Sequence, residues 1–182
     1  MTDDAIALQL YTPSEIGGSD LLEYELWIDG GALNTPFAQA ASYSGSPSSL
    51  THTLESGADS LTAGLLYSIK FKARNAVGDS PFSDILRVGL GDYPPAITGL
   101  VANIEECGPT YVAMSWPPVA APLELPVLGY VVQMIDKVTD EWVDVLDASA
   151  DADTVSYVHY GAVTGETYTF RVFAVNFNGR SS

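Results

Sequence analysis

The stretch YSIKFKARNAVGDSPFS at residues 67–83 decides the fold, because a second version of it, YTFRVFAVNFNGRSS, stands at residues 168–182. The aligned pairs, all 101 positions apart, are Tyr67 and Tyr168, Ala73 and Ala174, Asn75 and Asn176, and Gly78 and Gly179. A repeat of about 100 residues is too long for a solenoid and has the size of one small domain. The sequence therefore predicts two tandem domains, residues 1–92 and 93–182.

Both copies of this stretch alternate between apolar and polar residues. The apolar rows are Tyr67, Ile69, Phe71 and Ala73 in the first copy and Tyr168, Phe170, Val172 and Ala174 in the second. A period of two is typical of a β-strand with one buried face. Clusters of Gly and Pro separate these short runs, and no helical period is evident. The pattern predicts an all-β protein made of sandwiches.

The repeated stretch resembles the motif L-x-P-G-T-x-Y-x-F-x-V-x-A-x-N-x-x-G of fibronectin type III domains. This chain has LTAGLLYSIKFKARNAVG at residues 61–78 and AVTGETYTFRVFAVNFNG at residues 162–179, with Ala63 and Thr164 in place of the motif's Pro. The resemblance covers nearly the whole chain. It implies two immunoglobulin-like, fibronectin type III β-sandwiches in tandem.

Five aromatic residues are candidates for structural roles. They are the tyrosine-corner residues Tyr67 and Tyr168, the strand B tryptophan Trp116, and the aligned strand C tyrosines Tyr24 and Tyr130. In the resembling family the corner hydroxyl bonds nearby backbone. Leu10 takes the position of the tryptophan in the first copy.

The two copies differ in which of the seven family strands, A to G, they contain. The first copy begins at strand B, with no strand A before Ile6, and the second reaches only the expected start of strand G at Gly179. We therefore expect a window cut from a longer string of domains, with other domains of the same parent chain as partners. In the alternative, a neighbouring chain supplies the missing strands, as in donor-strand pairing.

The composition excludes some partners. With 7 basic and 23 acidic residues the formal net charge is −16, which disfavours binding to nucleic acid and to anionic lipid. No apolar run is long enough to span a membrane. The single cysteine, Cys107, cannot form an internal disulfide and is expected to be an idle thiol.

The sequence predicts no enzyme, no cofactor and no metal site. His52 and His159 stand alone, without the spacing of metal ligands, and are expected to be exposed. No nucleophile elbow or phosphate-binding loop occurs. Asp147, Asp151 and Asp153 could offer oxygen ligands for weak calcium binding, but a solvated acidic loop is favoured.

The outward faces of the two domains are expected to differ. In the first, the row Lys70, Lys72 and Arg74 should pair across strands with Glu23, Glu25 and Trp27, with a cation over Trp27. In the second, the outward row is largely apolar, and its candidate protein-contact residues are Val131, Ile135, Phe173 and Val175. Either the domain's own strand around Trp142, together with strand G, covers this face, or a protein partner does.

These observations favour a non-catalytic structural or adhesive module, a spacer or building block of a cell-surface or fibrous extracellular assembly. Its partners would be other domains of the parent, copies of itself or another protein. Two alternatives stay open: an accessory or linker module of a secreted carbohydrate-active enzyme, and a fragment of a receptor ectodomain. The fold alone does not choose among them.

Overall fold

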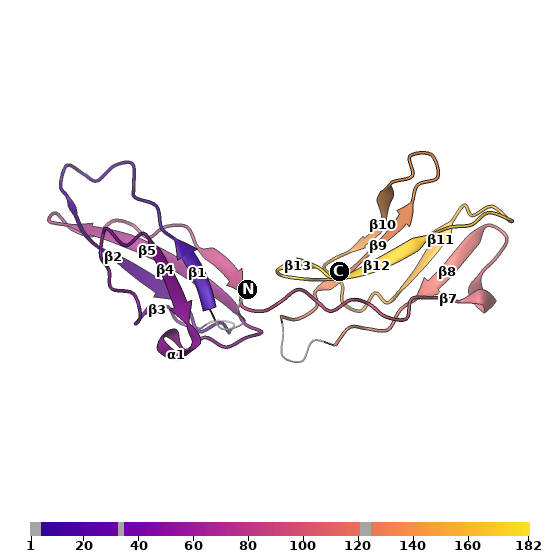
Figure 1. Ribbon diagram of the computed structural model, residues 1–182, viewed down its shortest axis with the longest axis horizontal. Helices are drawn as coiled ribbons and strands as arrows, with labels where there is room; N and C mark the ends of the chain where they lie inside the picture. Colours follow the sequence, from indigo (N-terminus) through magenta and orange to yellow (C-terminus); the bar gives the residue numbers. More distant parts are fainter. Residues whose placement is uncertain (1–4, 33–34, 121–124) are drawn as a thin grey trace. The chain divides into compact units, whose positions relative to one another are not determined.

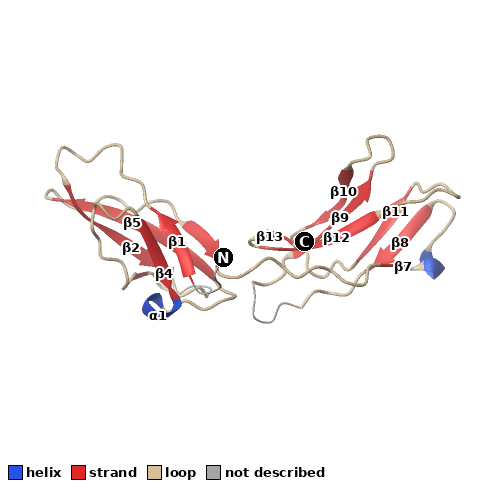
Figure 2. Ribbon diagram, in the orientation of Figure 1, coloured by secondary structure: helices blue, strands red, loops and turns tan. Residues whose placement is uncertain are grey.

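The structure is a computed structural model that describes residues 5–32, 35–120 and 125–182 (Figure 1). The chain divides into two compact units, Met1–Asp92 and Tyr93–Ser182, and this division lies at the residue where the sequence analysis placed it. Strands dominate both units, and the helices are single short turns (Figure 2). The predicted fold class, two β-sandwiches in tandem, is confirmed.

The first unit consists of a two-stranded sheet and a four-stranded sheet, both antiparallel. The smaller sheet pairs β1 (Ala5–Gln9) with β4 (Thr51–Glu55), and the larger has the order β3 (Ala38–Gln39), β2 (Leu21–Ile28), β5 (Leu66–Asn75) and β6 (Leu86–Gly89). These correspond to strands B and E and to strands C′, C, F and G. A short helix, α1 (Ser56–Asp59), follows β4. The core lies between the sheets, with Leu26 and Leu54 fully buried.

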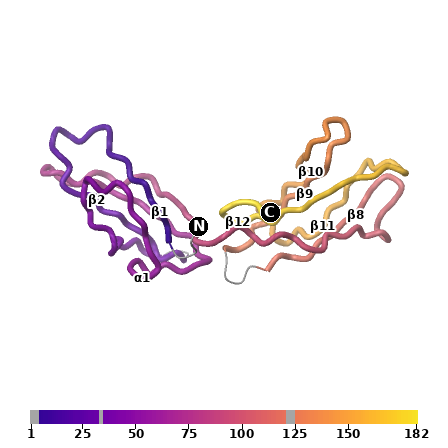
Figure 3. The backbone as a smooth tube through the Cα atoms, viewed as in Figure 1, coloured from indigo at the N-terminus to yellow at the C-terminus, as the bar shows by residue number. Residues whose placement is uncertain are grey.

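The second unit repeats this arrangement with an added strand. Its three-stranded sheet has the order β11 (Ser156–Tyr160), β8 (Tyr111–Ser115) and β7 (Val101–Ala102), and its four-stranded sheet has the order β10 (Trp142–Ala148), β9 (Gly129–Ile135), β12 (Phe170–Asn176) and β13 (Gly179–Arg180). A 3-10 turn, η1 (Ile104–Glu106), follows β7. Figure 3 traces the same strand sequence through each unit by colour.

The predicted loss of strand G in the second unit is wrong in detail. After a tight turn the chain reverses, and Arg180 pairs with Val175 and Gly179 with Asn176. These pairs form the short strand β13, which begins strand G. For the first unit, the expected absence of strand A concerns residues 1–4 as well, and these lie outside the described residues.

The repeated Asn-x-x-Gly is the turn between strands F and G. The Asn75 side-chain oxygen accepts hydrogen bonds from the backbone N–H of Val77 at 2.9 Å and of Gly78 at 3.1 Å. Asn176 holds the equivalent turn in the second unit. Gly78 has φ of 153° and so occupies a conformation that favours glycine. This explains why Asn and Gly recur together 101 positions apart.

Candidate functional site

The outward face of the first unit's large sheet carries a charged ladder. Cross-strand partners on β2 and β5 are Glu23 with Arg74, Glu25 with Lys72, and Trp27 with Lys70, as the alternation predicts. Arg74 Nη1 lies 2.9 Å from Glu23 Oε1, and Lys72 Nζ lies 3.1 Å from Glu25 Oε2. Opposite charges therefore face each other across the strand pair. We call Glu23, Glu25, Trp27, Lys70, Lys72, Arg74, Asp79 and Phe82 the first ladder.

Asp79, in the turn after β5, joins the two cations of this ladder. Its carboxylate accepts a hydrogen bond from Lys72 Nζ at 2.6 Å and also pairs with the guanidinium of Arg74. The hydrogen bonds from Arg74 first, and then from Lys72, hold the pKa of Asp79 well below its usual range. The same contact with Asp79, followed by that with Glu25, raises the pKa of Lys72.

Replacing Asp79 with Asn should make the stability of the first unit less dependent on pH. A carboxylate whose folded pKa is depressed stabilises the fold above its unfolded pKa of about 4 and loses that contribution as the pH falls toward the folded pKa. The wild type should therefore exceed Asp79→Asn in stability near neutral pH, and the gap should close below about pH 4. Urea unfolding across this range measures it.

Asp84→Asn is the matched control, because it removes the same charge from an exposed neighbouring position outside the ladder. An equal pH effect in both variants would show that overall charge, and not the contact with Arg74 and Lys72, is responsible.

An aromatic layer completes the first ladder. Lys70 Nζ lies 4.1 Å from the ring centroids of both Phe37 and Phe82, and Trp27 meets Phe82 edge-on at 5.8 Å. Trp27 Nε1 donates to Glu25 Oε2 at 3.1 Å. The expectation of a cation over Trp27 is therefore corrected: Lys70 stacks on the two phenylalanines, and Trp27 supports one of them.

The second unit has a related ladder on the same face. The guanidinium of Arg171 lies 4.0 Å from the Trp142 ring centroid and 5.0 Å from that of Phe173, and Arg180 lies 6.0 Å from Phe173. Asp144 Oδ2 pairs with Arg180 Nη2 at 2.9 Å, and this contact first holds the pKa of Asp144 below its usual range. We call Gln133, Trp142, Asp144, Arg171, Phe173 and Arg180 the second ladder.

Gln133 links the second ladder across the sheet. Its side-chain oxygen accepts from Arg171 Nε at 2.8 Å, and its nitrogen donates to Asp144 Oδ1 at 2.6 Å. Arg171, Gln133, Asp144 and Arg180 stand on β12, β9, β10 and β13, so one network ties all four strands of the sheet.

The prediction of an open apolar face at the candidate contact residues is corrected. Val131, on the central strand β9, is only 1% exposed, and Ile135, Phe173 and Val175 are half-buried. Phe173 stands opposite Val131 and lies beneath the two arginines. The domain's own cationic side chains therefore cover most of this face, and Val131 is not available to a partner.

The two corner tyrosines differ in burial. Tyr67 is 2% exposed, and its hydroxyl accepts a hydrogen bond from Thr62 N at 2.7 Å. The Tyr168 hydroxyl accepts from Val163 N at 3.1 Å, but its ring is only half-buried, with Lys137 Nζ 3.9 Å from the ring centroid. Both hydroxyls bond backbone five residues upstream, as the resemblance implies.

Tyr67→Phe should destabilise the first unit by about 1–3 kcal/mol, because the part-buried N–H of Thr62 would lose its acceptor. Tyr168→Phe should destabilise the second unit by less than about 1 kcal/mol, because the exposed N–H of Val163 can bond water instead. Denaturant unfolding of the two variants gives the comparison. Equal losses would contradict the assigned difference in burial.

The other three candidate structural residues lie in the cores. Trp116 is 3% exposed and meets Tyr130 edge-on at 5.8 Å. The Tyr130 hydroxyl accepts from Val119 N at 3.0 Å, and Tyr24 packs edge-on against Phe71 at 6.0 Å. Leu10, at the position of Trp116 in the first copy, is also buried.

Neither histidine is the exposed, isolated residue that the sequence suggested. His52 is half-buried, with Nε2 2.7 Å from Ser42 Oγ, and that hydroxyl donates to Asp59 Oδ2 at 2.6 Å. In a catalytic triad the imidazole stands between hydroxyl and carboxylate. Here the hydroxyl of Ser42 stands in the middle, so the group ties the loop before β4 to α1. His159 is half-buried and packs against Tyr168 and Phe170.

The acidic candidates for calcium binding are used within their own loop. Asp147 Oδ1 accepts from Ser149 N at 3.0 Å, and Asp151 accepts from Asp153 N and from the Thr154 hydroxyl. Among the residues that the structure describes, no three His, Cys, Asp or Glu side chains form a group that could hold a metal ion.

Two further surface features remain. Cys107 is half-buried, and its sulfur lies against the backbone of Ala113. Within the described ranges, no helix has the length and apolar character needed to cross a bilayer.

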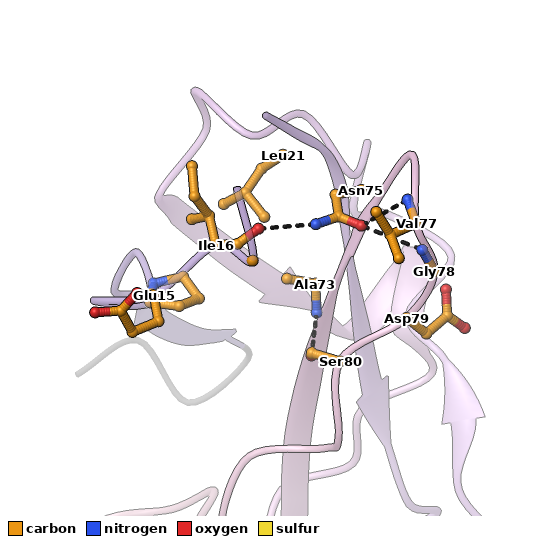
Figure 4. A pocket seen from close by; sticks show the side chains of 11 residues that line it. Glu15, Ile16, Leu21, Ala73, Asn75, Val77, Gly78, Asp79 and Ser80 are labelled. Carbon is orange, nitrogen blue, oxygen red and sulfur yellow. Dashed lines mark hydrogen bonds between the residues drawn. The ribbon is translucent and has the colours of Figure 1, made fainter. Parts of the chain in front are cut away.

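A groove of about 340 Å³ lies at one end of the first unit (Figure 4). It is bounded by the loop that contains Ile16 and by the turn that contains Val77 and Gly78. Asn75 donates to the Ile16 carbonyl at 2.8 Å, so the side chain that shapes the turn also holds the facing loop. Val77 is 82% exposed at the rim. The groove is a product of turn geometry.

Sequence reasoning missed several contributors to the ladders. Phe37 and Phe82 lie in loops, where alternation gives no signal, and Asp79 and Arg180 follow the strand pattern. One signal was present: Ser80 and Ser181 also stand 101 positions apart. Each serine hydroxyl accepts from the backbone N–H of the repeated alanine, Ala73 or Ala174.

Comparison with known proteins gives the following matches. No protein-family model matches the chain. Over 121 residues, 64% of this chain, the sequence is 31% identical to Myomesin-2 of Homo sapiens, and the match takes in 8% of that protein's length. Among solved structures the chain is similar to a segment of two fibronectin type III domains from chicken tenascin and to the FN1-FN3 domains of chicken CNTN1.

The first of these structures has 16% identity and a TM-score of 0.44, with 100% of this chain and 89% of that chain covered. The second has 17% identity and a TM-score of 0.47, with 98% of this chain and 59% of that chain covered.

Proposed function

We propose that the chain is a non-catalytic structural module, in which two sandwiches act as a spacer and building block within a larger extracellular or cell-surface assembly. The observation that carries this proposal is the use of both outward sheet faces. Each face is occupied by charged and aromatic side chains that tie neighbouring strands of the same sheet together.

The connections within the ladders suit a part that must keep its shape. In the first unit the cations of β5 pair with carboxylates of β2 and with Asp79. In the second unit Arg171, Gln133, Asp144 and Arg180 connect every strand of the sheet. Side-chain links between adjacent strands oppose their separation, which is the motion that extension of the chain would cause.

The ladders also define the surfaces offered to other proteins. Because Val131 is buried, contacts at the second unit would involve Trp142, Arg171 and Arg180 at the surface rather than an apolar row. Planar guanidinium groups and aromatic rings are enriched in protein interfaces. The acidic remainder of the surface would keep such contacts selective.

Stretching single molecules of the chain tests the spacer function. We expect two separate unfolding events, each releasing about 300 Å, the contour length of about 90 residues at ~3.5 Å per residue. Arg171→Ala should lower the unfolding force of one event only, because the ladder of one unit is broken. The matched control is Arg87→Ala, which removes an exposed arginine outside the ladders. Extension without distinct unfolding events would contradict the proposal.

A further inference from the structure

One backbone edge of the second unit's large sheet is largely unoccupied. Thr169 and Val175 of β12 accept hydrogen bonds from the β9 side, from Ile135 N at 3.1 Å and Leu128 N at 2.7 Å. Because successive residues of a strand point their backbone groups to opposite sides, those of Phe170 and Val172 point to the other edge. In the part of the chain that the structure describes, no strand pairs with that edge at these two residues.

The pairing on this edge begins correctly. Ser181 N donates to Ala174 O at 2.8 Å, and Ala174 N donates to Ser181 Oγ at 3.2 Å. The first unit starts identically, with the same two bonds between Ser80 and Ala73.

The first unit then continues along its edge. Ser83 bonds Phe71 in the same manner, and β6 pairs with Leu66–Ile69 of β5. The first unit therefore shows what the equivalent edge of the second unit is shaped to hold.

A groove accompanies the open edge. It has a volume of about 420 Å³ and lies between β7, β8 and the start of β12. Its apolar lining includes Leu100, Val101, Val112, Met114 and Phe170. A hydrogen-bonding edge and an apolar groove therefore lie side by side.

Burial at equivalent positions supports the same conclusion. In the first unit, where β6 is present, Ile6, Tyr67 and Ile69 are 5%, 2% and 3% exposed. Their aligned counterparts in the second unit, Val112, Tyr168 and Phe170, are all only half-buried. The core of the second unit thus lacks cover at the positions that β6 covers in the first.

We propose that this edge and groove form an acceptor site for one extended polypeptide segment supplied in trans, which would add to β12 as an antiparallel strand. Backbone hydrogen bonds to Phe170 and Val172 would provide affinity, and alternate apolar side chains would enter the groove. The proposal rests on the proposed function only in taking the partner to be a polypeptide.

The first unit also indicates the chemistry of the segment. On β6 and just beyond it, Val88 packs against the core and Leu90 is 4% exposed, while Arg87 between strand neighbours is exposed. The segment should therefore carry branched aliphatic residues two positions apart. A basic or neutral residue is favoured between them, because the chain has a formal net charge of −16.

The probe is a capped peptide with the sequence of residues 83–91, SDILRVGLG, added to the isotope-labelled chain and followed by NMR. We expect saturable shifts at Thr167–Ala174 and Val112, and at least about tenfold slower hydrogen exchange at the amides of Phe170 and Val172. Shifts at β5 instead would show exchange with β6 and would overturn the proposal. So would the absence of any shift at a peptide concentration of about 1 mM, well above the range of specific strand recognition.

Two matched changes sharpen the test. A peptide with Ser at the positions of Val88 and Leu90 should bind at least about tenfold more weakly, because two buried aliphatic side chains are lost. In the chain, Val101→Asp places a charge at a 52% exposed position of the groove wall and should weaken binding without unfolding the unit. Unchanged affinity in both cases would exclude the groove. Failure of the peptide to bind would leave the stretching result intact, and failure of the stretching test would not affect peptide binding.

Discussion

Replacing Gly129 with Ala is expected to destabilise the second unit by about 3 kcal/mol or more, the upper range for added bulk in a packed site. Gly129 begins β9, where the backbone of the following hairpin passes directly over it. An added Cβ would lie 1.9 Å from the carbonyl oxygen of Ala148 and 2.6 Å from the carbonyl carbon of Ser149. Both atoms belong to the backbone, so β10 would have to move for the methyl group to fit.

Gly57→Ala is the matched control, since a Cβ at that glycine meets no atom within 4 Å. It should change stability by less than about 0.5 kcal/mol. Denaturant unfolding, with NMR shifts of β9 and β10 as a local readout, measures both variants. A small effect at Gly129 would contradict the close approach of the hairpin.

Leu54→Ala should destabilise the first unit by about 2–5 kcal/mol, the usual range for a leucine deleted from a rigid core. Leu54 is 0% exposed and lies on β4, where its side chain packs into the core that also contains Leu26 and Tyr67. The two-stranded sheet offers little backbone to close the cavity, because β4 pairs only with β1 among the described strands.

Leu22→Ala is the corresponding control, because Leu22 belongs to the same unit and is 58% exposed. Its effect should be within about 0.5 kcal/mol. A loss at Leu22 comparable to that at Leu54 would mean that burial does not determine the energetics of this unit.

Features encoded by local sequence were predictable. The alternation of β5 gave the pairing of Lys72 with Glu25 and of Arg74 with Glu23, because a period of two fixes which side chains share a face. The Asn-x-x-Gly turn and the bonding of the Tyr67 hydroxyl followed from a motif confined to a few residues. Such features depend little on distant parts of the chain.

Features that depend on neighbouring strands and loops were not predictable in the same way. Alternation placed Val131 and Phe173 on one face but could not show what covers that face. The cover depends on the register of β10, which shifts at an irregularity between Asp144 and Leu146 and so places Trp142 beside Arg171. Likewise, the contact of Ser42 with Asp59 joins loop and helix residues that share no periodic pattern.

Scanning calorimetry of the intact chain and of the two core variants tests the central claim that the chain consists of two self-supporting structural units. Each hydrophobic core draws its residues from one unit only. Two unfolding transitions are predicted, with Leu54→Ala lowering the midpoint of one and Gly129→Ala lowering that of the other. In each variant the unaffected transition should keep its stability within about 0.5 kcal/mol, as for independent sites. A single transition, or a shift of both by either substitution, would contradict the account.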